Sequence, residues 1–300
     1  MRRIAVLYNA RSGAAAADEA PVDQRLAATL EQHGVEADLR EFDPWTVRQD
    51  IDVLVSARPD AVIVAGGDGT VKSVAEYLIP TGVPLGVVPM GTMNVLARDL
   101  GIPDELEAAV DALLSAPVRW IDVARVNDDV FLCSSALAML PHLGRVREQA
   151  REARGLAMLR VLRKAVRVVR RYPRHRLRLV VDGETHTHRT RAVVVSNNPL
   201  ASEPALVPGR ERLDTGRLAA YVARDRTKWD LVMIAAKLLD GTWQHAKRLR
   251  TYHGRTVEIS SEHLELVSVM NDGESVQLSM PLRYEILPKA LAVLVPGERG

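Results

Sequence analysis

The sequence has little cysteine and few aromatic residues, and it lacks any long apolar run. Cys133 is the only cysteine in 300 residues, which excludes an internal disulfide and is typical of a protein in a reducing compartment. Because aromatic residues make up 4% of the chain, alanine, valine and leucine must supply most of the core. No stretch approaches the roughly 18–20 apolar residues that a spanning helix needs. We therefore expect a soluble, cytoplasmic protein.

Positive charge is concentrated in one segment, although the net charge of the chain is only +2. Thirteen Lys and Arg residues stand against two acidic residues between Arg145 and Arg178. At 100° per residue, this segment divides into an apolar half and a cationic half, which predicts a basic amphipathic helix over 145–178. One interpretation is a solvated charged face, and the other is peripheral contact with an anionic membrane. We expect no nucleic-acid partner, because the segment has no recognisable binding motif.

Two regions of different pattern follow one another along the chain. The first ~120 residues alternate short apolar runs with helical periodicity, which predicts an open, mostly parallel α/β sheet. After Pro117, closely spaced short strands predict an antiparallel β-sandwich, interrupted by a helix at Trp229–Leu239. The predicted domains are therefore 1–122 and 123–300, and the last strand can return to the first domain. The final two strands are expected at Leu282–Ile286 and Leu291–Val295.

A glycine-rich turn, Gly66-Gly67-Asp68-Gly69-Thr70, follows the apolar strand Ala61–Ala65 and precedes a helical pattern from Val71. A strand, a glycine turn and a helix N-terminus together form an anion site, because the first amide groups of a helix lack partners. A carboxylate at Asp68 suits the neighbourhood of phosphates only if a divalent cation is present. This turn predicts a nucleotide-phosphate site.

Two further polar turns follow predicted strands of the same sheet. Asn9-Ala10-Arg11-Ser12-Gly13 follows the first strand, and Gly91-Thr92-Met93-Asn94 follows Leu85–Val88. Each has an ordinary interpretation, the first as a plain loop and the second as a helix cap by Thr92 or Asn94. Because the carboxyl ends of parallel strands lie at one edge of a sheet, the three turns together favour a nucleotide site.

A third kind of motif, Asn271-Asp272-Gly273-Glu274, lies near the C-terminus. Asn-Asp-Gly between apolar strands is a favoured hairpin turn, which explains the first three residues without any function. The hairpin does not require Glu274. A kinase needs a carboxylate near the acceptor hydroxyl, and Glu274 is a candidate for that role.

In order and spacing, these motifs resemble the diacylglycerol kinase catalytic-domain family, the bacterial soluble lipid kinases related to sphingosine and ceramide kinases. Leu96-Ala97-Arg98-Asp99-Leu100-Gly101 also matches the family, whereas Ala10 replaces its usual proline. The resemblance implies an α/β nucleotide-binding domain, a β-sandwich lipid-binding domain, and ATP with Mg²⁺ in the cleft between them. It implies nucleotide contacts by one set of residues: Asn9, Ser12, Gly13, Gly66, Gly67, Asp68, Gly69, Thr70, Thr92 and Asn94. It places Asp68 near the catalytic Mg²⁺, and Glu274 with Asp272 at the lipid hydroxyl.

The sequence departs from this family at two places. A structural metal is implied at an Asp-Gly turn, but Thr215 precedes Gly216 here and Asp214 lies one residue early. A shift of one residue in a strand reverses the side-chain direction, which argues against a structural metal at Asp214. The glycine-rich segment before the lipid pocket is replaced by Ser134–Pro141, which predicts altered substrate choice.

The predicted function is ATP-dependent phosphorylation of a lipid hydroxyl, with diacylglycerol as an example. An NAD kinase is the enzymatic alternative, although its family places an Asn-Glu pair where this chain has Gly91–Asn94. A non-catalytic nucleotide- or lipid-binding regulator on the same fold is the other alternative. The sequence identifies neither the lipid nor the oligomeric state.

Overall fold

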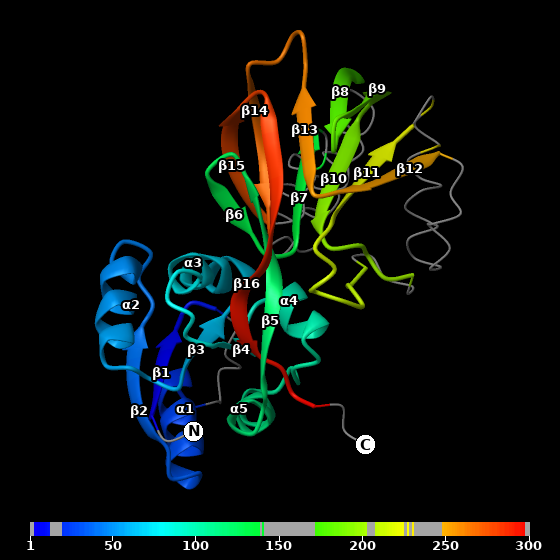
Figure 1. The fold of residues 1–300 in the computed structure, drawn as a ribbon. Helices are drawn as coiled ribbons and strands as arrows, with labels where there is room; N and C mark the ends of the chain where they lie inside the picture. The colour runs from blue at the N-terminus through cyan, green and yellow to red at the C-terminus, as the bar shows by residue number, and fades with distance from the viewer. Residues whose placement is uncertain are drawn as a thin grey trace, which may run out of the picture. The chain divides into compact units, whose positions relative to one another are not determined.

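The computed structural model describes residues 3–12, 20–138, 140, 172–202, 208–224, 227, 230 and 248–297 (Figure 1). The predicted helix Trp229–Leu239 lies outside the described residues except for Asp230, and so do Gly13 and residues 145–171 of the predicted basic helix. Clustering divides the chain into unit 1, Met1–Val123 with Pro288–Gly300, and unit 2, Ala124–Leu287.

Unit 1 is built on a parallel sheet with the strand order β2-β1-β3-β4. Its strands are β1 (Arg3–Tyr8), β2 (Glu36–Glu41), β3 (Ala61–Gly66) and β4 (Leu85–Pro89). The C-terminal part of β16 (Leu282–Leu294) continues the sheet beside β4, in parallel, through Val293 and Leu85. Every residue of β3 and β4 is buried, as is expected where helices cover both faces of a parallel sheet.

Five helices accompany this sheet in the part of unit 1 that the structure describes. They are α1 (Val22–Gln32), α2 (Val47–Ser56), α3 (Asp68–Leu78), α4 (Val95–Asp99) and α5 (Leu106–Leu114). Helix α1 packs against α5, and α2 packs against α3, with the strands between the two pairs (Figure 1). Gly34 adopts a positive φ of 64° just past α1, which is the conformation that commonly ends a helix.

The strand order places a topological switch point between β1 and β3. The chain leaves β1 for β2 on one side, and then returns to β3 on the other side of β1. Loops that follow β1 and β3 therefore leave the sheet in opposite directions, which is where open α/β sheets bind ligands. Two of the three polar turns predicted to contact phosphate, those after β1 and β3, occupy these two loops.

Unit 2 consists of antiparallel strands. One sheet has the order β12-β11-β10-β7-β14-β15, and a second ladder runs from the first part of β16 through β13 and β8 to β9. The strands are β5 (Val118–Val126), β6 (Asp129–Phe131), β7 (Ser134–Ala138), β8 (His175–Val181), β9 (Glu184–Thr190), β10 (Ala192–Asn197), β11 (Leu218–Ala223), β12 (Leu249–Gly254), β13 (Thr256–Ser260), β14 (Leu266–Asn271) and β15 (Glu274–Ser279).

The core of unit 2 lies between these two sets of strands. Leu177 and Ile259 contribute from one side, and Val195 and Val222 from the other. The predicted fold class, a mostly parallel α/β part followed by an antiparallel β part, is therefore confirmed. Among the described residues, no helix has the length and hydropathy needed to cross a membrane.

Some predicted elements are wrong in detail. The predicted basic helix cannot extend over 145–178, because His175–Val181 forms strand β8, where Leu177 and Leu179 alternate with exposed arginines. The two strands expected at 282–286 and 291–295 are one continuous strand, β16. Strands β7, β9 and β12 were not predicted. Helix α3 begins at Asp68 instead of Val71, so the glycine turn forms the first turn of the helix.

Candidate active site

The loops that follow β3 and β4 are in direct backbone contact. The Met90 amide donates to the Gly66 carbonyl at 3.0 Å. A Cβ on Gly91 would lie 2.7 Å from the Gly67 Cα, closer than real side chains approach. Neither glycine has a positive φ, so their role is close approach and not an unusual backbone conformation. The glycines of both motifs thus allow two loops at the carboxyl edge to pack together.

Gly91→Ala is expected to separate these loops, because its new methyl group meets backbone at Gly67 and cannot move aside. We expect an overpacking cost of about 1–3 kcal/mol in the free energy of unfolding, together with weaker binding of the ATP that the family resemblance implies. Thermal unfolding and ATP calorimetry measure the two effects. Gly101→Ala, at a position with open space but a positive φ of 69°, is the control for strain remote from the loop contact. Unchanged ATP affinity in Gly91→Ala would contradict the role given to this contact.

Asp68 is the first residue of α3 and joins the two loops. Its Oδ1 accepts a hydrogen bond from the Val95 amide at 2.7 Å, at the start of α4. A carboxylate in the first turn of a helix is stabilised by the positive end of the helix dipole. Asp68 is therefore held in place by the N-termini of two helices.

The loop after β1 is joined to α3 by Asn9. The Asn9 Nδ2 donates to the Thr70 Oγ1 at 2.9 Å, while its Oδ1 accepts from the Arg11 amide at 3.0 Å. The Ser12 amide donates to the Asn9 carbonyl at 2.9 Å, which closes a tight turn. Asn9, Ser12 and Thr70 therefore lie close together, as expected for turns at one sheet edge.

Asn94 stabilises its own loop. It adopts a left-handed conformation with φ 44°, and its side chain exchanges hydrogen bonds with the Gly91 amide (2.8 Å) and carbonyl (3.1 Å). The predicted helix-cap hydrogen bond of Asn94 is absent from this described stretch. Its side chain instead shapes the turn that carries Thr92.

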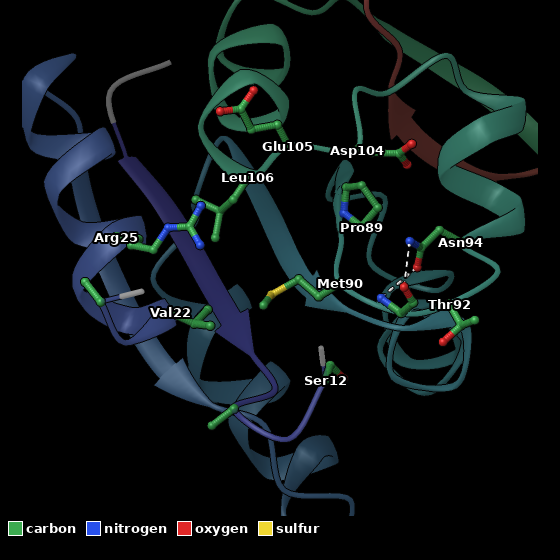
Figure 2. A pocket seen from close by; sticks show the side chains of 13 residues that line it. Ser12, Val22, Arg25, Pro89, Met90, Thr92, Asn94, Asp104, Glu105 and Leu106 are labelled. Carbon is green, nitrogen blue, oxygen red and sulfur yellow. Dashed lines mark hydrogen bonds between the residues drawn. The ribbon is translucent and has the colours of Figure 1, made fainter. Parts of the chain in front are cut away.

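A cavity of about 510 Å³ opens beside these loops, within unit 1 (Figure 2). Ser12, Thr92 and Asn94 line it, and Arg25, Asp104 and Glu105 line it from α1 and the segment before α5. The volume is in the range of small-ligand sites. Figure 2 shows Ser12 and Thr92 at one end of the cavity and Arg25 and Glu105 at the other. Apolar surface comes from Val22, Met90 and Leu106.

Sequence patterns did not indicate the side chains of α1 and α5. Arg25 forms a two-pronged ion pair with Glu107, with both nitrogen–oxygen distances at 2.8 Å. The hydrogen bond from Arg25 lowers the pKa of the Glu107 carboxyl. The two helices are far apart in sequence, so only their packing brings Arg25 to the cavity. No local motif could have identified it.

The predicted acidic turn of unit 2 is the hairpin between β14 and β15. Asp272 and Gly273 have φ values of 49° and 92°, as a tight hairpin turn requires. The Asp272 carboxylate accepts three backbone hydrogen bonds, from Leu132 (2.6 Å), Cys133 (2.8 Å) and Ser134 (2.9 Å). Burial raises the pKa of Asp272, while these donors oppose the rise.

Glu274 differs from Asp272 in its surroundings. It is exposed at the first position of β15 and pairs across the hairpin with Asn271. Asp272 therefore anchors the turn, and Glu274 presents its carboxylate from the anchored turn.

Comparison with known proteins gives two family matches in chain order. The model described as diacylglycerol kinase catalytic domain matches residues 3–126. The model described as YegS C-terminal NAD kinase beta sandwich-like domain matches residues 144–295, about half of the chain. The chain belongs to the diacylglycerol kinase catalytic-domain family. The predicted family and the predicted enzyme class, an ATP-dependent lipid kinase, are thus confirmed.

Individual relatives agree with this family. A diacylglycerol kinase of Mycobacterium tuberculosis is 27% identical over 308 residues, covering 98% of this chain and 95% of that protein. An uncharacterized protein of Synechocystis sp. is 26% identical over 245 residues, and the match spans 80% of this chain but 55% of that protein. The crystal structure of a diacylglycerol kinase from Bacillus anthracis has a TM-score of 0.70 at 18% identity, over 98% of this chain and 97% of that one. The last similarity concerns the fold alone.

A magnesium ion in this protein would need ligands from the substrate phosphates as well as from the protein. Among the described residues, no cluster of three or more His, Cys, Asp or Glu side chains could hold a metal by itself. Mg²⁺ in kinases is commonly bound by one or two carboxylates together with substrate phosphates and water. Asp68, fixed at the helix N-terminus, fits this arrangement.

The turn predicted to hold a structural metal is occupied by other interactions. The Asp214 carboxylate accepts from the Arg212 Nε at 3.0 Å. The Thr215 amide and hydroxyl both donate to the Asn198 Oδ1, at 2.8 and 2.6 Å. These hydrogen bonds hold the turn, and among the described residues Asp214 belongs to no group of three or more His, Cys, Asp or Glu side chains that could hold a metal.

Proposed function

We propose that this lipid kinase transfers the γ-phosphate of ATP to the hydroxyl of a neutral lipid such as diacylglycerol. The observation that carries the proposal is the contact between the Gly67 and Gly91 loops around Asp68, at the carboxyl edge of the sheet in a family-matched domain. Three loops of one sheet edge are joined there by specific hydrogen bonds. Such a preorganised edge supplies backbone donors for a polyphosphate.

The nucleotide is proposed to lie in the cavity of unit 1. Its phosphates face the end with Ser12 and Thr92, whose loops are hydrogen-bonded to α3 through Asn9 and Val95. The residues of the Gly66–Thr70 turn do not themselves line the cavity. The base and ribose of the nucleotide face the other end, where Met90 and Leu106 offer apolar surface and Glu105 offers a hydrogen-bond acceptor for hydroxyl groups. Glu105 disfavours phosphate at that end, because like charges repel, and the Arg25 guanidinium there is already paired with Glu107.

The roles of the two acidic sites follow from their surroundings. Asp68 is proposed to hold Mg²⁺, which when bound neutralises charge on the transferring phosphate. Glu274 is proposed to accept the proton of the lipid hydroxyl, since its carboxylate is exposed on a fixed turn. Asp272 is proposed to position that turn. Most of the rate enhancement then comes from orientation and electrostatics.

The purified protein tests this function with ATP, Mg²⁺ and lipids in neutral mixed micelles. We expect diacylglycerol to give equal amounts of ADP and phosphorylated lipid. Ceramide, a sphingoid base, a monoacylglycerol and a polyprenol serve as parallel substrates that identify the lipid class. ADP formation independent of any lipid would indicate a different acceptor and contradict the proposal.

Peripheral contact with an anionic membrane is also proposed, and it is supported by an arginine face on β8 and β9. Arg176 lies directly opposite Arg189 in the ladder, and Arg178 lies on the same exposed face. Like charges directly opposite each other in a sheet destabilise it. An anionic membrane surface beside these arginines would reduce their mutual repulsion. Among the described residues, none of the three forms an ion pair, whereas Arg283 on the same ladder pairs with Glu258.

The triple variant R176Q/R178Q/R189Q is expected to bind phosphatidylglycerol vesicles roughly 100-fold more weakly at low salt. Each basic residue near an anionic surface contributes about 1 kcal/mol. Sedimentation with vesicles measures the change. The control R125Q/R212Q/R283Q removes the same charge from arginines that are already ion-paired. Equal losses in both triples would indicate net charge alone and contradict a specific face.

A further inference from the structure

A buried arginine lies beneath the acidic turn of unit 2. Arg210 is 6% exposed, and its guanidinium contacts the segment between β6 and β7. The Arg210 Nη1 donates to the carbonyls of Leu132 (2.6 Å) and Asn197 (3.0 Å), and its Nη2 lies 3.3 Å from the Cys133 Sγ. A buried guanidinium is costly unless its donors are satisfied, so this arrangement is specific.

The same segment holds the Asp272 carboxylate. In the peptide that joins Leu132 to Cys133, the carbonyl oxygen accepts from Arg210 and the N–H donates to Asp272. The peptide therefore lies between a cation and an anion, and both polarise it in the same direction. The Leu132 carbonyl also accepts a hydrogen bond from the Asn197 Nδ2, at 2.8 Å.

We propose that Arg210 is a positioning residue for phosphoryl transfer. It fixes the Leu132–Ser134 segment, and Asp272 is hydrogen-bonded to that segment. Asp272 in turn anchors the hairpin turn from which Glu274 extends. The inference rests on the proposed function and adds a residue that touches neither ATP nor the lipid. Its action is indirect, through Leu132, Cys133 and Asp272.

The planar geometry of the guanidinium is central to this role. Arg210 reaches three acceptors on two different segments, and a lysine ammonium cannot reproduce this fork. Arg210→Lys keeps the charge and loses the geometry, whereas Arg210→Gln loses both. The two variants therefore separate the effect of charge from that of shape.

We expect Arg210→Gln to lower kcat for lipid phosphorylation roughly 10- to 100-fold, with the KM for ATP changed less than about twofold. Displacement of a catalytic group by about 1 Å costs a factor of this size, while the nucleotide cavity of unit 1 is not altered. Arg210→Lys should fall between Arg210→Gln and the wild type. The matched control is Arg212→Gln, two residues along, whose exposed side chain pairs with Asp214 and should leave kcat unchanged.

Chemical rescue gives a readout that loss of stability alone would not produce. Millimolar guanidinium ion is expected to restore part of the kcat of Arg210→Ala, and equal sodium is expected to restore none. In the full-length Arg210→Gln variant, backbone amide hydrogen exchange is expected to accelerate in segments 130–137 and 270–276. In the Arg212→Gln variant, exchange in these two segments should stay as in the wild type.

The outcomes separate this inference from the proposed function. A wild type without lipid kinase activity would overturn the proposed function, and the inference with it. An active wild type with unchanged kcat in Arg210→Gln would overturn the inference alone. A decrease in kcat that matches the unfolded fraction, with no rescue by guanidinium and no selective exchange, would also overturn it.

Discussion

Glu274→Gln is expected to lower kcat for lipid phosphorylation by about 10²–10⁴-fold, the usual contribution of a general base. The substitution keeps the size of the side chain and removes its ability to accept the hydroxyl proton. ATP affinity should stay within about twofold, because Glu274 lies in unit 2 and the cavity proposed to hold the nucleotide is formed by unit 1. Single-turnover kinetics and ATP calorimetry measure the two quantities.

The control for this experiment is Glu265→Gln, an exposed glutamate just before β14 of the same hairpin. It changes the same charge without altering the turn. If Glu274→Gln retained wild-type kcat, the role of proton acceptor would have to pass to another group.

Asp68→Asn is the second variant with a large expected effect. The asparagine Oδ1 can still accept the Val95 amide, so the two loops keep their geometry while the negative charge is lost. We expect kcat/KM to fall at least ~100-fold, and the Mg²⁺ concentration for half-maximal rate to rise, since electrostatic stabilisation of phosphoryl transfer is lost.

A magnesium titration of both enzymes, with thermal unfolding in parallel, checks this result. Asp52→Asn, on the exposed face of α2, is the matched control for charge. A variant with wild-type magnesium dependence would show that Asp68 acts only as the link between the loops.

The sequence predicted the parts of the fold in which one local pattern dominates. Fully apolar β3 was recognisable because burial on both faces requires a continuous apolar run, and the glycine-rich motif at the start of α3 ends that run. Strand β9, Glu184–Thr190, was missed because its polar and histidine residues carry no apolar alternation. Its position is set by pairing with β8, which no local pattern reports.

Some residues of the candidate site were predicted from the sequence, and others were not. Loop residues such as Asn9 and Thr70 were found because turns after parallel strands meet at one edge, and their hydrogen bond confirms that they meet. Arg25 and Arg210 were missed, since tertiary packing alone brings them to the cavity and to the acidic turn. The turn pattern did separate the two acidic residues, because the hairpin explains Asp272 and does not require Glu274. The structure adds that Asp272 accepts three backbone hydrogen bonds and that Glu274 is exposed.

The most direct measurement of the central claim uses γ-labelled ATP with a total bacterial lipid extract, followed by identification of the labelled lipid. We predict one dominant labelled product, a phosphorylated neutral lipid, formed by the wild type and reduced at least about 100-fold in initial rate with Glu274→Gln and Asp68→Asn. Binding of ATP without any labelled lipid would contradict a kinase and favour a regulator that retains the fold.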